Sequence, residues 1–444
     1  MSKSFIIYES LYEAGARMKI SRFLQITITA MILFTIIITF ILLIKPSWYP
    51  QSPIKVGVLF SQTGEFAGSD RLLIDATILA IEEINAQGGL LQRKIDIVLA
   101  DGRSSDEVFA KEANRLIKKE KVSVIFGCLT SSCRKRVKEV VEHENHLLMY
   151  PVAYEGLEQS PNIIYLGDAP NQQFIPAIKW AIDHLGKRFY LVGSDYIWPH
   201  IANEIIKTEI ANLGGQVVGE DYILLGDNKM QPIIQHILAT KPQVILHTLV
   251  ASSNKFFFEA LHQAGISSQK IPVLTFAIGE GQVQEFNIKY IAGNYAAWSY
   301  FESINDPENI AFVKRFKKRF GQDRVTTDPM ASVYMGVKLW AQAVLDAGTD
   351  DVLAVRNTIL RQSLHSPSGP VYIDPYNQHT WRIVRIGQFL ENGQIKEVWR
   401  SAKPIPPEPY PPFKSKAEWQ NLLQQLYEKW GQQWGNYQKT NQPS

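Results

Sequence analysis

Hydroxyl and aromatic side chains gather directly after two apolar stretches in the first half of the chain. Residues 127–132 (GCLTSS) follow the apolar stretch 122–126, and residues 150–156 (YPVAYEG) begin where the apolar stretch 146–150 ends. A hydroxyl-rich turn at the start of a helix presents unpaired backbone N–H groups together with small O–H groups. Both runs can therefore hydrogen-bond a small ligand, although ordinary connections between strands and helices have a similar composition.

Motifs for catalysis, metal binding and nucleotide binding are absent from the sequence, including GxxxxGK, GxSxG and HExxH. His143 and His146 lie three positions apart without a third ligand, which favours a helix end over a metal site. Glu155 and Glu158 are close enough for acid–base chemistry, but we expect solvated or helix-capping roles for both. The sequence therefore predicts neither an enzyme nor a bound cofactor.

The elements that must position these runs alternate between strands and helices. We expect strands at 54–60, 94–100, 122–126, 188–193, 216–224, 244–249 and 273–276, and helices at 71–86, 106–119, 201–213, 230–239 and 254–264. Such alternation indicates right-handed βαβ units and parallel sheets, so the fold class is α/β. Because the pattern restarts near residue 188, we expect two lobes whose loops line a cleft at the carboxyl ends of the strands.

The second half of the chain is expected to cross repeatedly between the lobes. Helices at 310–320 and 329–347 would return to the first lobe, and strands at 380–386 and 397–399 to the second, which predicts a multi-strand hinge. Asn392-Gly393 is a hairpin signal. The expected division is 54–172 with 300–362 for lobe 1, and 173–299 with 363–414 for lobe 2.

An apolar stripe follows the proline-rich run 404–412. We expect a C-terminal amphipathic helix within residues 415–444 that carries one apolar face: Trp419, Leu422, Leu423, Leu426, Tyr427, Trp430 and Trp434. Packing on its own domain is the simpler reading of this stripe, and a partner or membrane contact is the alternative.

The N-terminus contains a stretch long enough to span a bilayer. Residues 23–44 carry no charge, and neither a small-x-small cleavage site nor a lipid-accepting cysteine follows them, so we favour a transmembrane anchor over a cleaved signal. Arg17, Lys19 and Arg22 predict that residues 1–22 are cytoplasmic and that the folded part is periplasmic or extracytoplasmic. Beyond residue 50 the chain has 41 basic and 41 acidic residues, so no basic face argues for nucleic acid.

Cys128 and Cys133 are the two cysteines of the chain, and they flank the first hydroxyl-rich turn. Outside the cytoplasm they could pair, but their spacing does not guarantee the required Cα separation. Two reduced, buried thiols are equally compatible with the sequence.

Four runs in the chain resemble a known family. GCLTSSCRK, YPVAYEGLEQSPNIIYLGDAPNQQ, LVGSDYIWP and FGQDRVTTDPMASVYMGVKLWAQAV look like the branched-chain-amino-acid type of periplasmic binding protein. Within that family they resemble the urea and short-chain-amide branch, which includes substrate-binding subunits of ABC transporters and an amide sensor. The likeness covers about residues 54–410. It implies two Rossmann-like lobes that close on a ligand and release it unchanged.

The resemblance also implies a ligand site built of hydroxyls, rings and one carboxylate: Ser131, Tyr150, Tyr154, Tyr196, Trp198 and Glu280. Two positions in the same loops depart from the pattern. Leu129 stands where an aromatic residue is usual, and Val152 stands where the amide sensor has a threonine.

The implied set suits a small uncharged amide, because hydroxyls and N–H groups can donate to its carbonyl while Glu280 and backbone carbonyls accept from its amino groups. The sequence therefore predicts an extracytoplasmic substrate-binding component of an ABC transporter that presents urea or a short-chain amide to the permease subunits. Two alternatives stay open: an amino-acid-binding protein of the same fold, and an amide-sensing regulatory receptor. An amino acid needs partners for both of its charges, and no Arg or Lys is among the implied site residues.

Overall fold

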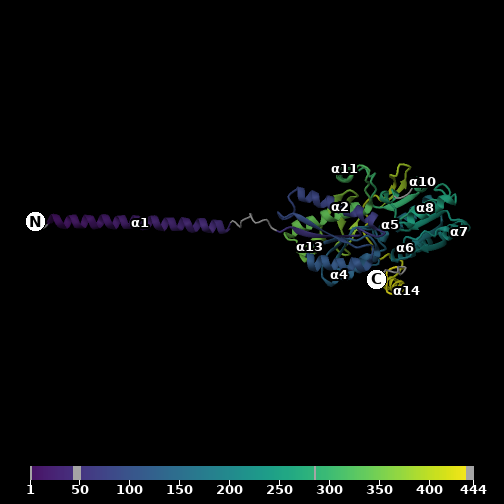
Figure 1. Ribbon diagram of the computed structural model, residues 1–444, viewed down its shortest axis with the longest axis horizontal. Helices are drawn as coiled ribbons and strands as arrows, with labels where there is room; N and C mark the ends of the chain where they lie inside the picture. The colour runs from purple at the N-terminus through teal and green to yellow at the C-terminus, as the bar shows by residue number, and fades with distance from the viewer. Residues whose placement is uncertain (1–2, 44–51, 285–286, 437–444) are drawn as a thin grey trace. The chain divides into compact units, whose positions relative to one another are not determined.

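The structure is a computed structural model that describes residues 3–43, 52–284 and 287–436 (Figure 1). The chain divides into two compact units, Met1–Ser52 and Pro53–Ser444. The first unit contains one helix, α1 (Lys3–Leu43), whose segment Gly15–Thr39 has a mean hydropathy of 1.8 and is long and apolar enough to cross a membrane. The predicted span 23–44 lies within this helix, except for Ile44, which is outside the described residues.

The first lobe of the second unit is built on a five-stranded parallel sheet with the order β2-β1-β3-β4-β5. Its elements are β1 (Ile54–Phe60), α2 (Ala67–Ala86), β2 (Ile95–Asp101), α3 (Asp106–Arg115) with the π-helical turn η1 (Leu116–Glu120), β3 (Ile125–Gly127), α4 (Ser131–His143), β4 (Leu148–Tyr150), β5 (Ile163–Tyr165), α11 (Pro307–Phe320), α12 (Asp328–Ala347) and α13 (Val352–Ile359). The inner strand β1 is buried at six of its seven positions, as its continuous apolar run predicts.

The second lobe is built on a seven-stranded mixed sheet with the order β15-β14-β10-β9-β8-β6-β7. Its elements are α5 (Pro170–His184), β6 (Arg188–Ser194), α6 (Ile197–Asn212), β7 (Gln216–Ile223), α7 (Gln231–Thr240), β8 (Val244–Thr248), α8 (Ser253–Gln263), β9 (Val273–Thr275), α9 (Glu280–Val283), α10 (Ile288–Ile291), β10 (Tyr295–Trp298), β14 (Arg385–Phe389), β15 (Ile395–Arg400) and α14 (Lys416–Lys429). Figure 1 shows α2, α4 and α13 around the first sheet and α6, α7 and α8 around the second.

The α/β class and the two-lobe plan are confirmed, and the hairpin predicted at Asn392-Gly393 joins β14 to β15 as an antiparallel pair. Gly393 has a φ of +84°, a left-handed conformation that favours glycine. Sequence periodicity did not indicate β5, α5, β10, β11, β12 or α13. The strands β5 and β10 have only three and four residues, too few for a periodic pattern.

Residues 363–381 are placed differently from the expected division of the lobes. Strands β11 (Ser363–Ser366), β12 (Gly369–Ile373) and β13 (Thr380–Trp381) form a separate three-stranded sheet, and β11 contacts α11 and α12 of the first lobe. Only β14 and β15 of the C-terminal strands join the second sheet, so the expected strand at 380–386 is split between two sheets.

Three chain segments cross between the lobes, at residues 166–169, 299–306 and 382–384, as the hinge prediction required. Each crossing contributes one member of a buried polar cluster, which consists of Asp168, Ser299 and Arg382. The Ser299 hydroxyl donates to Asp168 Oδ1 at 2.5 Å, and the Arg382 guanidinium lies 3.7 Å from the same carboxylate oxygen. Arg382 also donates through Nη2 to Asp328 Oδ2 at 2.8 Å. The hinge is therefore held by polar and ionisable side chains that are buried.

Candidate ligand-binding site

A cavity of about 90 Å³ lies between loops of the two lobes. Seven of the eight residues singled out from the sequence line it: Leu129, Ser131, Tyr150, Val152, Tyr196, Trp198 and Glu280. The lining also includes residues that the sequence analysis did not indicate, among them Phe66, Asn254, Phe276, Trp298, Tyr300 and Asp328. Asn254 follows the strand expected at 244–249, so the expectation that loops at the carboxyl ends of the strands line the cleft could have pointed to it.

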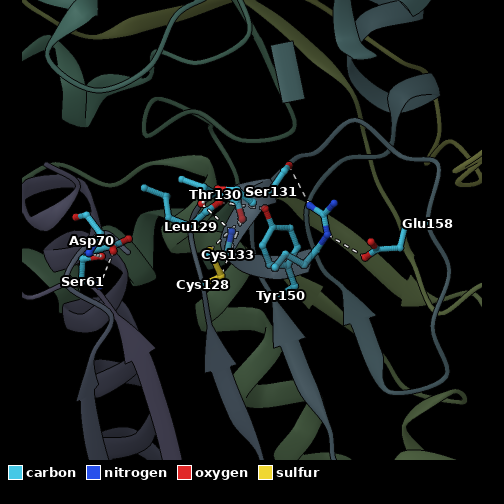
Figure 2. The surroundings of a disulfide bond; sticks show 12 residues. Ser61, Asp70, Cys128, Leu129, Thr130, Ser131, Cys133, Tyr150 and Glu158 are labelled. Carbon is cyan, nitrogen blue, oxygen red and sulfur yellow. Dashed lines mark hydrogen bonds and ion pairs between the residues drawn. A yellow bond between two sulfur atoms is a disulfide. The ribbon is translucent and has the colours of Figure 1, made fainter. Parts of the chain in front are cut away.

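The first-lobe wall is formed by the turn after β3, which Figure 2 shows beside Tyr150. Thr130 caps helix α4, because its hydroxyl oxygen accepts a hydrogen bond from the Cys133 backbone N–H at 3.2 Å. The Tyr150 hydroxyl donates to the Leu129 carbonyl at 3.0 Å, so it holds the turn from the neighbouring strand. The turn is thus positioned by bonds within its own lobe.

The hydroxyl of Ser131 is also engaged within its own lobe. It donates to Glu155 Oε2 and accepts from Arg134 Nη1 at 3.0 Å. The role of ligand donor that the resemblance implied therefore requires Ser131 to exchange a partner, since its single proton is directed at Glu155.

Glu155 and Glu158 are not solvated or capping residues, and that prediction was wrong. Both are buried and pair with Arg134, at 2.8 Å for Glu155 and 3.0 Å for Glu158. Burial alone would raise the pKa of Glu158, but the charges of Arg134 and Lys135 hold it below its usual value. The two carboxylates balance a buried guanidinium under the cavity wall, a partnership across 21 to 24 positions that sequence spacing does not reveal.

Tyr154 is the one predicted site residue that does not line the cavity. Its ring stacks on Tyr165 at 5.2 Å between centroids, and its hydroxyl lies 2.5 Å from His379 Nε2. Tyr150 ends β4 and Tyr154 lies four residues later in an irregular segment, so no sequence periodicity indicates that one ring lies in the cavity and the other in the core. Tyr154 is a core residue of the first lobe.

The second-lobe wall differs because several of its polar atoms have no partner among the described residues. These atoms are Trp198 Nε1, Asn254 Oδ1 and Glu280 Oε2, and all three belong to buried residues that line the cavity. A buried polar atom without a hydrogen bond is costly, and such atoms are rare in folded proteins. Their collection around one cavity is the feature expected of a ligand-binding surface.

Burial raises the pKa of Glu280 from its ordinary value of 4.5 to about 8. Its Oε1 accepts a hydrogen bond from the Glu302 backbone N–H at 2.8 Å, which partly opposes this rise. Near neutral pH the side chain is therefore mostly protonated, so it offers one O–H donor together with acceptor oxygens. Among the described residues that line the cavity there is no lysine or arginine.

Cys128 and Cys133 form a disulfide with a Cα separation of 6.5 Å, which decides between the alternatives that the sequence left open. Figure 2 shows that the bond closes the turn containing Leu129, Thr130 and Ser131. Both half-cystines are fully buried. The disulfide therefore fixes the part of the first lobe that contributes three consecutive residues to the cavity.

A hydrogen-bonded contact joins the lobes outside the hinge. Glu65 Oε1, in the loop after β1, accepts hydrogen bonds from the Ser252 hydroxyl at 2.6 Å and from the Ser252 backbone N–H at 3.0 Å. Ser252 precedes helix α8, which carries Asn254. The contact lies next to the cavity, because the neighbouring residues Phe66 and Ala251 both line it.

A family model described as periplasmic binding protein domain matches residues 54–416, so the chain belongs to this family. Leu/Ile/Val-binding protein homolog 6 from Brucella abortus is 25% identical over 338 residues, which are 73% of this chain and 85% of the relative. This relative is therefore similar to the chain over most of the length of both proteins. A stretch of 121 residues is 41% identical to a protein named limonene hydroxylase from Geobacillus stearothermophilus, but it spans only 22% of that protein.

Solved structures share the fold at lower identity. A solute-binding protein of an R. palustris ABC transporter, in complex with 4-hydroxybenzoate, superposes with a TM-score of 0.73 at 22% identity and covers 80% of this chain and 98% of its own. A leucine-binding protein from Thermotoga maritima superposes with a TM-score of 0.69 at 20% identity and covers 78% of this chain and 98% of its own. Proteins that share this fold therefore hold ligands of different chemistry.

Proposed function

We propose that this chain is the substrate-binding component of an ABC transporter and that it holds urea or another short, uncharged amide in the cavity between its lobes. The observation that carries this proposal is the second-lobe wall, where an indole N–H, an amide oxygen and one oxygen of a protonated carboxyl group lack partners among the described residues. An amide presents a carbonyl acceptor and N–H donors, so it complements this mixture of donors and acceptors without bringing a charge.

The size of the cavity also favours a ligand of few atoms. Its volume of about 90 Å³ is well below the roughly 300–1,000 Å³ of pockets that hold drug-sized molecules. Aromatic side chains surround it, including Tyr150, Trp198 and Trp298. Where buried polar side chains line a site, a ligand that leaves one of them unpaired is rejected strongly, which would allow urea and acetamide to be told apart from apolar molecules of the same size.

The charge of the lining argues against an aromatic acid such as the ligand named for the R. palustris protein. A carboxylate needs a positive or strongly donating partner, and the part of the lining that the structure describes contains acidic but no basic side chains. The nearby guanidinium of Arg134 is fully buried and already paired with two glutamates.

An amino acid is the second candidate, since relatives of the family carry amino acids in their names. The carboxyl groups of Glu280 and Asp328 could face an ammonium group, and the start of α4 at Ser131 could face a carboxylate. This candidate requires Glu280 to be ionised, whereas burial favours its neutral form. We therefore favour a neutral amide over an amino acid as the ligand.

The transport role rests on the family and on the two-lobed fold. Closure of the lobes around the ligand creates a form that permease subunits can recognise, after which the ligand is released without chemical change. The helix α1 would anchor the protein at the outer face of the cytoplasmic membrane, with the binding unit outside. An amide-sensing receptor would use the same closure to signal to a partner instead.

The proposal is tested by calorimetric titration of the full-length chain in detergent with urea, acetamide, formamide, leucine and 4-hydroxybenzoate. We expect saturable binding of at least one of the three neutral ligands and none of 4-hydroxybenzoate. Binding of leucine alone would contradict an amide ligand and support an amino-acid ligand. Binding of 4-hydroxybenzoate alone would contradict both.

A further inference from the structure

Helix α14 begins at residue 416, the last residue that the family model matches, and the rest of the helix lies beyond that match. The helix packs on α6 of the second lobe, and Figure 1 shows α14 in yellow next to α6. Its anchors are Trp419 and Leu423, which are buried, and the Trp419 indole N–H donates to the Pro411 carbonyl at 2.9 Å. The expected packing of the apolar stripe on its own domain is confirmed, although the helix ends at Lys429 and Trp434 lies beyond it.

The residues that follow this helix, 430–436, are here called the C-terminal segment. They run alongside the loop that carries Tyr196 and Trp198 to the cavity. The Trp434 carbonyl accepts from the Ile197 backbone N–H at 2.9 Å, and the Asn436 backbone N–H donates to the Asp195 carbonyl at 2.9 Å. The Asn436 side chain adds a hydrogen bond to Asp195 Oδ2 at 2.7 Å.

These hydrogen bonds supply an N-terminal cap for helix α6. The first N–H groups of a helix have no partner within the helix, and the N-cap residue of α6, Tyr196, provides no side-chain cap. The Trp434 carbonyl satisfies the N–H of Ile197, the first residue of α6. Because Trp198 is the next residue, the capping bond directly supports one of the side chains that line the cavity.

The same segment also contacts the first lobe. The Lys135 ammonium lies 4.6 Å from the centre of the Trp434 ring, and Arg136 Nη2 donates to the Gln432 carbonyl at 3.3 Å. Both basic residues belong to α4, whose first residue, Ser131, lines the cavity. The segment thus links the ligand loop of the second lobe to the ligand helix of the first.

We propose that the C-terminal segment is a positioning element of the ligand site, which caps α6, holds residues 195–198 in place and ties them to α4. The proposal deepens the proposed function, because it assumes that the cavity binds a ligand. Pre-organising the loop before the ligand arrives lowers the entropic cost of binding, and the link to α4 favours the arrangement in which the lobes approach each other.

Two chains shortened at the C-terminus provide the test. One ends at Lys429, and the matched control ends at Asn436. The first readout needs no ligand and is hydrogen exchange of the amides of residues 195–198. We expect the Ile197 amide to exchange at least about 10-fold faster in the shorter chain, because its hydrogen-bond partner is gone, and the control to match the intact protein.

The second readout is calorimetric titration with urea and acetamide. We expect the shorter chain to bind at least about 10-fold more weakly than the control, and Asn436→Ala to bind about 2- to 10-fold more weakly through loss of one hydrogen bond. Asn436→Ala keeps the test decisive if the shorter chain fails to fold, because this variant leaves the helix and its packing intact.

The two proposals fail in different ways. If the intact chain binds neither urea nor acetamide, the ligand assignment fails, while faster exchange in the shorter chain would still support positioning. Unchanged exchange of Ile197 in the shorter chain, or unchanged exchange and affinity in Asn436→Ala where the shorter chain is unfolded, would overturn the positioning role.

Discussion

The two walls of the cavity differ in how their polar groups are used. On the first-lobe wall, Ser131 and Tyr150 are hydrogen-bonded to Glu155 and Leu129 of the same lobe. On the second-lobe wall, polar atoms of Trp198, Asn254 and Glu280 have no partner among the described residues. The difference indicates that the first lobe offers a prearranged surface, whereas the second lobe holds the groups that a ligand must satisfy.

The same contrast extends to the structures behind the two walls. The first wall is braced by a disulfide and by the buried Arg134 with its two glutamates. The second wall is braced at residues 195–198 by the C-terminal segment, through hydrogen bonds to exposed or partly exposed residues. Elements held by few buried contacts open most readily, so we expect the second wall to be the more mobile of the two.

Removing the carboxyl group of Glu280, which supplies a donor and an acceptor on the second-lobe wall, should have the largest effect on ligand affinity. Glu280→Leu is expected to weaken binding of the amide about 10- to 100-fold, because a buried ligand group left without a partner costs ~1–3 kcal/mol. Glu280→Gln is the matched control, since its amide keeps a donor and an acceptor. Calorimetric titration with acetamide measures the affinity of both variants. Equal affinities of Glu280→Leu and the parent chain would show that Glu280 does not bind the ligand.

On the first wall, Ser131→Ala should act mainly on stability. The change leaves the buried groups of Glu155 and Arg134 short of a partner, so we expect the free energy of unfolding to fall by ~1–3 kcal/mol. Scanning calorimetry measures this effect, and titration should give a smaller loss of affinity than Glu280→Leu gives. A loss of binding without a loss of stability would reverse the assigned roles of the two walls.

The contrast also predicts a pH dependence. Folded Glu280 has a pKa of about 8, above its ordinary value of 4.5, so between these values the native state holds a proton that the unfolded state has released. Its contribution to stability is therefore fully present below about pH 4.5 and is lost as the pH rises to about 8. Melting curves across this range should show the parent chain losing stability relative to Glu280→Gln, and a constant difference would contradict the raised pKa.

The smallest effect on binding is expected outside the cavity. Tyr154→Phe removes the hydroxyl that lies beside His379, so the free energy of unfolding should fall by about 0.5–1.5 kcal/mol while the affinity for acetamide stays unchanged. Scanning calorimetry and titration of the same sample check both statements. A tenfold weaker affinity of Tyr154→Phe for acetamide would show that Tyr154 belongs to the ligand site, as the family resemblance implied.

Sequence patterns were sufficient for the two-lobed α/β plan, and the family resemblance indicated seven of the residues that line the cavity. Continuous apolar runs identified strands such as β1, and the polar breaks after them identified the loops that converge on the cleft. Three features depended on contacts between distant residues and had no local signal. These features are the pairing of Arg134 with Glu155 and Glu158, the burial of Tyr154 against His379, and the capping of α6 by Trp434.

A crystal structure of the chain with acetamide tests the central claim most directly. We predict that the amide lies between the lobes with its polar atoms within hydrogen-bond distance of at least two of Trp198 Nε1, Asn254 and Glu280. An amide bound only through Ser131 and Tyr150, with those three groups still unpartnered, would contradict the account of the two walls.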